Sequence, residues 1–309
     1  MTLLDEASLH SSVDDSLKGL LKLPSLDNTY GALFLGATFS FMIYGLIVHQ
    51  TYRYYRLYPT DPLTLKMLVL AILLVETFHC ILLINSCYFH LITNYFNPVT
   101  LLEQSWSLKM LIPTSALTTL LCQGFYARRI WLVDRRYRII VGFAALPAVV
   151  FIGMSLGTLL LLNTSVLLHG TAFERFTWMV SAMFGASVII EVLFSGTLIF
   201  ILHRSRTGFK RTDSMIDLLI LYTVNSGLLV SAIAVLGLIF PVIYPHNFIY
   251  IGMSMVETKL YASCVLTALN YRRTIWNRGT GVVDLNAERA DLVNRIEAGD
   301  KMPGYVRDF

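Results

Sequence analysis

Two charged residues stand in the middle of an apolar stretch that is long enough to cross a membrane. The stretch runs from Asn247 to Arg273 and carries Glu257 and Lys259 near its centre. A charged side chain at bilayer depth costs about 2.5–3.5 kcal/mol on insertion scales, so apolar residues would serve better if crossing were the only task. The two residues are two positions apart, about 200° around a helix, so they cannot face the same partner.

Four further polar residues fall at a similar depth in other apolar stretches, and together the six form a predicted polar layer: Glu76, His79, Glu191, Asn225, Glu257 and Lys259. With a rise of 1.5 Å per residue, each lies roughly 16–24 Å from the same side of the predicted bundle. All six therefore fall within about two helical turns of one another in depth. Glu76 and His79 are three positions apart, so they share one helix face.

The spacings favour one arrangement of the charges. Lys259 would point into the bundle, towards Glu76 or Glu191, and Glu257 would find another partner such as Tyr261. The layer then holds three carboxylates and one ammonium group. Either one carboxyl is protonated, or a cation or basic ligand supplies the missing positive charge. The layer is thus a candidate site for a ligand, an ion or a proton, and the structural alternative is a buried salt bridge that fixes helix packing.

Other kinds of chemistry find little support in the residue pattern. Of the seven histidines only His79 is deep, so a three-histidine zinc site is not expected. No Gly-x-Ser-x-Gly, Walker A or dinucleotide fingerprint occurs. The arginines do not form a stripe with interleaved aromatics, so nucleic acid is not an expected partner. We therefore predict no enzyme activity, no metal and no cofactor.

The elements that must position these residues are predicted from composition and from runs of apolar residues. The chain of 309 residues is 55% hydrophobic and only 14% charged, whereas soluble proteins are roughly 25% charged. Each of seven apolar segments is near or above the ~20 residues that a membrane-spanning helix needs. They lie at about 31–51, 63–86, 106–127, 139–162, 176–202, 215–239 and 248–270. We predict an all-α membrane protein with a seven-transmembrane helix bundle.

The basic residues predict the orientation of this bundle. Fourteen Lys and Arg lie in alternate loops and at the start of the tail, against three on the other side. Because cytoplasmic loops carry the excess of positive charge, the N-terminus is predicted outside and the C-terminus in the cytoplasm. Residues 1–28 would be a polar outer segment, 29–272 the seven-helix domain and 273–309 a cytoplasmic tail. The basic loops form a predicted cytoplasmic interface at Arg128, Arg129, Arg135, Arg136, Arg204 and Arg206.

Several short motifs resemble those of one membrane protein family. They are Tyr30-Gly31-Ala32, Glu76-Thr77-Phe78-His79, the run from Gln123 to Trp131, Lys259-Leu260-Tyr261-Ala262-Ser263 and Leu269-Asn270-Tyr271-Arg272. Over about residues 28–280 the chain resembles a multi-pass family, a domain of unknown function that is expanded in mushroom-forming fungi. The acid in the segment 63–86 is often Asp in that family, and this chain has Glu76 there. Since the family has no established ligand or activity, the resemblance implies a fungal seven-helix protein and little more.

The function predicted from these features is receptor-like or sensory, with a small-molecule ligand at the polar layer. A transporter or proton-coupled carrier is the first alternative, and a structural membrane protein with a buried salt-bridge lock is the second. The expected partners are the lipid bilayer and a cytoplasmic protein at the basic inner loops. Gly153 and Gly157 form a Gly-x-x-x-Gly motif that could support a homodimer. For such a protein we expect the plasma membrane rather than an endomembrane.

Overall fold

The computed structural model describes residues 31–94, 105–133, 135–164, 171–204, 210–244 and 249–272. Within these ranges the side chains at 133, 135, 163–164, 171–174, 210–219 and 221–226 are not described. The predicted outer segment 1–28 and the whole of the predicted tail 273–309 lie outside the described residues.

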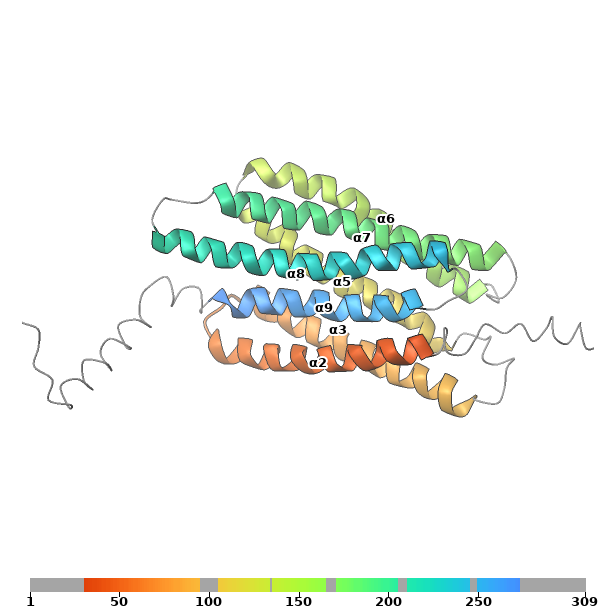
Figure 1. The fold of residues 1–309 in the computed structure, drawn as a ribbon. Coiled ribbons are helices and arrows are strands. Elements are labelled where there is room, and N and C mark those ends of the chain that lie inside the picture. Colours follow the sequence, from red (N-terminus) through yellow and green to blue (C-terminus); the bar gives the residue numbers. More distant parts are fainter. Residues whose placement is uncertain are drawn as a thin grey trace, which may run out of the picture.

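The described chain forms seven long α-helices and contains no strand (Figure 1). Their bounds are α2 Ala32–Leu57, α3 Leu63–Tyr88, α5 Trp106–Val133, α6 Arg138–Thr164, α7 Thr171–Arg204, α8 Lys210–Ile243 and α9 Ile249–Asn270. A π-helical turn, η2 (Phe89–Thr93), extends α3, and a 3-10 turn, η3 (Arg135–Tyr137), precedes α6. Each helix coincides with one of the seven predicted apolar segments, which confirms the prediction of an all-helical protein.

The helices pack in chain order, and the last one closes onto the first. Along the chain α2 packs on α3, α3 on α5, α5 on α6, α6 on α7, α7 on α8 and α8 on α9. Helix α9 also packs along α2 and against α5, so it has neighbours on several sides. Figure 1 shows α2 and α9 side by side and running in the same direction, from right to left. We call the two ends of the bundle the Ala32 end and the Leu57 end, after the first and last residues of α2.

The contact between α2 and α9 is close enough to require glycine on both helices. A Cβ atom on Gly36 would lie 2.5 Å from the Cα atom of Gly252, and one on Gly252 would lie 2.7 Å from the carbonyl oxygen of Ala32. Small residues let helix backbones approach in this way inside membranes, where dispersion contacts drive packing. The Gly-x-x-x-Gly motif of α6 differs, because a Cβ on Gly153 would meet nothing within 4 Å.

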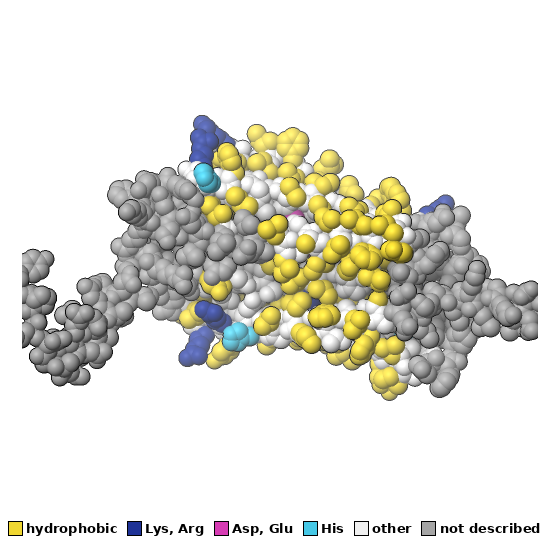
Figure 2. Space-filling view, in the orientation of Figure 1, with side chains coloured by type: hydrophobic (Ala, Val, Ile, Leu, Met, Phe, Trp, Pro, Cys, Tyr) yellow, Lys and Arg dark blue, Asp and Glu magenta, His cyan; other side chains and the backbone are white. Residues whose placement is uncertain are grey.

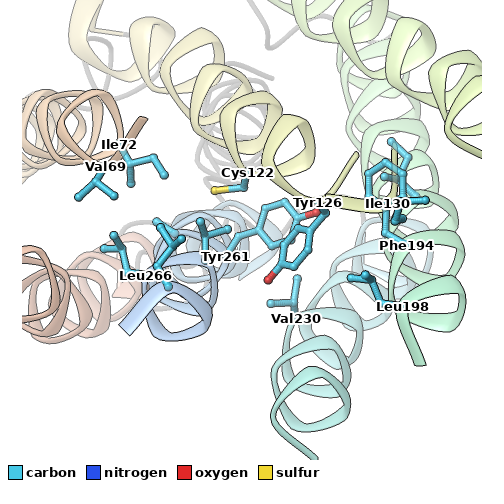
Figure 3. Close-up of a cluster of buried hydrophobic side chains, with 14 of the residues drawn as sticks. Val69, Ile72, Cys122, Tyr126, Ile130, Phe194, Leu198, Val230, Tyr261 and Leu266 are labelled. Atoms are coloured by element: carbon cyan, nitrogen blue, oxygen red, sulfur yellow. The ribbon is translucent and has the colours of Figure 1, made fainter. Parts of the chain in front are cut away.

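The largest buried apolar cluster fills the half of the bundle nearer the Leu57 end. It joins side chains from all seven helices, among them Ile72, Tyr126, Leu198, Val230 and Leu266. Figure 3 shows Tyr126 of α5 and Tyr261 of α9 together at its centre, with their ring centroids 6.1 Å apart. The apolar residues towards the Ala32 end fall into three smaller clusters. Packing is therefore more continuous in one half than in the other.

Four of the described helices are long and apolar enough to cross a membrane: Ala32–Leu57, Leu63–Thr93, Arg138–Leu162 and Arg175–Arg204. Large apolar side chains such as Phe143 and Leu146 lie exposed on α6. Figure 2 shows the middle of one face covered by hydrophobic side chains, while Lys and Arg gather near its ends. Such a surface is suited to lipid, and the protein is accordingly membrane-embedded. Helix α9 is not among the four, and Glu257, Lys259 and several hydroxyl side chains interrupt its apolar sequence.

Candidate functional site

Helix α9 carries polar side chains on two sides because its neighbours differ. One side faces α2 and α3, and the other faces α5, α8 and, across a cavity, α7. Glu257 and Lys259 are two residues apart, so a helical turn of 3.6 residues sends them to opposite sides. The structure therefore separates the two charges that the sequence analysis placed in a single layer.

Lys259 forms a buried ion pair with Glu76 of α3, the first of the two acids that the sequence offered it. Both side chains are 0% exposed. The Lys259 ammonium also donates to the backbone carbonyl of Glu76 at 3.1 Å, and it lies 5.7 Å from the ring centroid of Tyr44. Oε2 of Glu76 receives the Lys259 hydrogen bond, and Oε1 has no hydrogen-bond partner among the described residues. Because the pair is completely removed from water, loss of either partner would leave a buried charge without compensation and strongly destabilise the protein.

His79 lies one turn from Glu76 on the same helix and connects this side to α5. Its Nε2 atom is 3.0 Å from the hydroxyl oxygen of Ser115, while Nδ1 has no hydrogen-bond partner in the described part of the chain. The imidazole is fully buried. Ser115 in turn lines a cavity, so the hydroxyl group stands between the buried ion pair and an open space.

That cavity lies among α5, α6, α7 and α9, in the half of the bundle nearer the Ala32 end. Its wall begins with Leu108, Phe176 and Tyr250, near the starts of three helices, and reaches Ser187 and Glu257 about halfway along. The cavity has a volume of about 100 Å³. One water molecule needs about 10–15 Å³, so the cavity can hold a small molecule. Its surface is mostly apolar.

Glu257 is half-buried and forms part of the cavity wall. Oε1 of its carboxylate accepts a hydrogen bond of 3.1 Å from the hydroxyl group of Ser187 on α7. The sequence analysis named Tyr261 as a candidate partner, and this was wrong. Tyr261 instead shares a hydrogen bond with Glu191, because α7 places Ser187 beside Glu257 and, one turn further along, Glu191 beside Tyr261.

Glu191 occupies a third environment, between α7, α8 and α9. Oε1 of this carboxylate accepts a hydrogen bond of 2.9 Å from Ser195, one turn further along α7. Gly227 of α8 makes room for the pair, since a Cβ there would lie 2.7 Å from the Ser195 hydroxyl oxygen and 3.2 Å from Glu191 Oε1. The side chain of Asn225, the sixth predicted residue, lies outside the described residues.

The predicted cytoplasmic interface is described only in part. Arg128, Arg136 and Arg204 are exposed and Arg129 is half-buried. The side chain of Arg135 and the whole of Arg206 lie outside the described residues.

A further set of polar contacts, not predicted from the sequence, joins α2 to α9 near the Leu57 end. Arg272 pairs with Asp61, and Tyr54 donates to the same carboxylate oxygen at 2.8 Å. Asn270 donates to the backbone carbonyl of Gln50 at 2.8 Å. The Gln50 amide donates to the hydroxyl groups of Ser263 and Thr267 at 3.1 and 2.9 Å. The spacing of Ser263, Thr267 and Asn270, at i, i+4 and i+7, places all three on one face of α9 and could have indicated this polar contact from the sequence.

No group of three or more His, Cys, Asp or Glu side chains in the described ranges could hold a metal ion. The chemistry available at the cavity is therefore that of one carboxylate and several hydroxyl groups in an apolar wall. This arrangement suits non-covalent recognition of a small molecule.

Comparison with known proteins gives one match. Residues 187–274, which span the second part of α7, all of α8 and all of α9, match a family of unknown function (DUF6534). The matched region contains Glu191, Glu257 and Lys259, and it covers less than half of the chain. No curated protein and no solved structure matches the chain.

Proposed function

We propose that the protein is a receptor-like membrane protein that binds a small molecule in the cavity between α5, α6, α7 and α9. The observation that carries the proposal is the position of Glu257, a half-buried carboxylate at the deep end of a mostly apolar cavity. Ligand sites are usually apolar hollows with a few placed polar groups that fix orientation. The proposed role is non-catalytic.

The proposal includes seven membrane spans, with the N-terminus outside, the C-terminus in the cytoplasm and a plasma-membrane location. Supporting this, the three helices outside the apolar four (α5, α8 and α9) pack beside them along the bundle. The excess of Lys and Arg falls in the loops at the Leu57 end, which would then face the cytoplasm. The cavity would lie in the outer half, and a cytoplasmic protein would meet the basic inner loops.

The family match supports membership of a family of unknown function, and we keep its expansion in mushroom-forming fungi as part of the proposal. A homodimer through Gly153 and Gly157 also belongs to it. The lipid-facing position of Gly153, where a Cβ would meet nothing within 4 Å, is compatible with such a contact.

The test is the accessibility of the cavity from each side of the membrane. Ser254 lines the cavity, and among the described residues its hydroxyl group bonds only to the carbonyl of Ile251 on its own helix, so Ser254→Cys breaks no described contact with another helix. The variant is made in a Cys87→Ser background and treated, in sealed vesicles of known orientation, with a membrane-impermeant methanethiosulfonate reagent. Thr38→Cys, on α2 and away from the cavity, is the matched control, because Thr38 also bonds only to its own helix.

We expect labelling of Ser254→Cys from the outer face alone, with Thr38→Cys unreactive. Labelling from both faces would overturn the receptor-like reading in favour of a carrier. Absence of labelling from either face would show a closed bundle, in which the polar residues serve only to lock the helices.

A further inference from the structure

We infer that the ligand of this cavity is a small lipophilic amine. Its ammonium group pairs with Glu257, and its apolar part fills the cavity between Glu257 and the Ala32 end of the bundle. The inference rests on the proposed function and specifies the chemical class that the site would take. It follows from the distribution of charge, from the chemistry of the wall and from the size of the space.

The described core holds more carboxylates than cations. Glu191 bonds to the hydroxyl groups of Ser195 and Tyr261, and Glu257 is the carboxylate that lines the cavity. Lys259 is the cation of the polar layer, and it is committed to Glu76. Glu257 forms no ion pair with any described Lys, Arg or His, and its hydrogen bond comes from the neutral hydroxyl group of Ser187. A carboxylate at this depth is costly unless a positive charge compensates it. An ammonium group would form a charge-assisted hydrogen bond at that position.

The wall of the cavity also fits an amine with an apolar body. Phe151, Phe176, Phe184 and Tyr250 contribute aromatic surface, and Leu, Ile, Val and Met side chains contribute the rest of the apolar surface. Aromatic faces attract ammonium groups as well as apolar groups, so they suit a molecule that carries both. An anionic ligand would instead meet the uncompensated carboxylate in a medium of low dielectric constant.

A metal cation is a poorer fit to the same residues. Calcium takes six to eight oxygen ligands, and magnesium needs near-octahedral geometry with several of them. The cavity wall offers one carboxylate, Glu257, with hydroxyl groups spread along its length. An organic ammonium group needs only one carboxylate and one or two further acceptors, which matches what the site presents.

The experiment compares an amine with its neutral counterpart on the full chain in lipid nanodiscs. Cyclohexylmethylamine and cyclohexylmethanol have the same carbon skeleton and differ only in the charged group. Their dissociation constants are measured by protection of Ser254→Cys from the methanethiosulfonate reagent, and by saturation-transfer NMR on the chain without that substitution. The same measurements are made on Glu257→Gln, which keeps the shape of the side chain and removes its charge.

We expect the amine to bind at least tenfold more tightly than the alcohol, and Glu257→Gln to remove this difference while leaving binding of the alcohol unchanged. Equal binding of the two compounds would overturn the inference and leave the proposed function standing. If neither compound binds while the methanethiosulfonate reagent still labels Ser254→Cys, the inference is also overturned and the proposed function still stands. An unreachable Ser254→Cys would remove the proposed function itself. If Glu257→Gln does not fold, the ratio of the two dissociation constants in the unsubstituted chain still decides.

Discussion

The two sides of α9 differ in how they treat a buried charge. On the side of α2 and α3, Lys259 is paired with Glu76, both are fully buried, and the α2 backbone touches that of α9 at Gly36 and Gly252. On the side of α5 and α7, Glu257 is half-buried beside an open cavity and bonds to a neutral hydroxyl group. Helix α9 thus carries a charge that is paired within dense packing, Lys259, and a charge without a described cation beside a cavity, Glu257.

The difference indicates separate roles for residues that the sequence analysis grouped together. A buried ion pair in dense packing holds helices in position, because removal of either partner leaves a charge without compensation. A carboxylate beside a cavity is available to a molecule that enters. Substitutions on the side of α2 and α3 should therefore cost more stability than substitutions at the cavity.

Replacement of Lys259 should be the most damaging change. Lys259→Met leaves the Glu76 carboxylate fully buried without its cation, so we expect a loss of about 3–5 kcal/mol in the free energy of unfolding. The loss is measured by denaturant unfolding of the full chain in detergent micelles. Glu257→Gln, two residues away, should change this free energy by less than about 1 kcal/mol.

The double variant Glu76→Gln with Lys259→Met provides the control. If the pair is structural, it should recover most of the stability that Lys259→Met loses, since no charge is then left alone. A Lys259→Met chain as stable as the original would contradict the division between the two sides.

Gly36→Ala should have the next largest effect. The added Cβ would lie 2.5 Å from the Gly252 Cα, so α2 and α9 must move apart, at a cost of about 1–3 kcal/mol. Gly45→Ala on the same helix is the matched control, since its Cβ would meet nothing within 4 Å. Thermal unfolding of both variants gives the comparison.

The same variants sharpen the contrast between the sides. Because Gly36 lies away from the cavity, labelling of Ser254→Cys should keep its rate in a Gly36→Ala background. A large change in that rate would mean that the two sides of α9 are coupled rather than independent.

Asp61→Asn should have the smallest effect. The Arg272–Asp61 pair has side chains that are 38% and 14% exposed, so water screens it, and such pairs contribute at most about 1 kcal/mol. We expect a loss within this limit that shrinks as salt is added, measured by thermal unfolding at low and high ionic strength. A loss as large as that of Lys259→Met would show that burial does not separate the two pairs.

The helices were predictable because a membrane-spanning helix requires a long run of apolar residues, which can be recognised in the sequence. All seven apolar segments are helices, and the rise per residue gave the depth of Glu76 and Lys259 well enough to suggest their pairing. Depth is one coordinate along a helix, and it depends on the chain alone.

The hydrogen-bond partners, the glycine contact and the cavity depend on how each helix is rotated about its axis and packed against its neighbours. The depth of a residue along its helix does not determine this. Ser187 as the partner of Glu257, and Glu191 as the partner of Tyr261, follow from the rotation of α7 about its axis. The contact of Gly36 with Gly252 joins the first and last helices, and no local pattern links two residues so far apart in the chain. The cavity is likewise a product of packing among four helices.

The pairing of Glu76 with Lys259 also bears on how the protein is made. The two residues are 183 positions apart, so α3 leaves the ribosome long before the helix that neutralises its acid. At a synthesis rate of about 5–20 residues per second, the delay is about 10–40 s. During this interval the nascent chain carries a membrane-buried carboxylate without its counter-charge. A chain that stops before α9 keeps that defect permanently, which distinguishes an unfinished copy of the protein from a complete one.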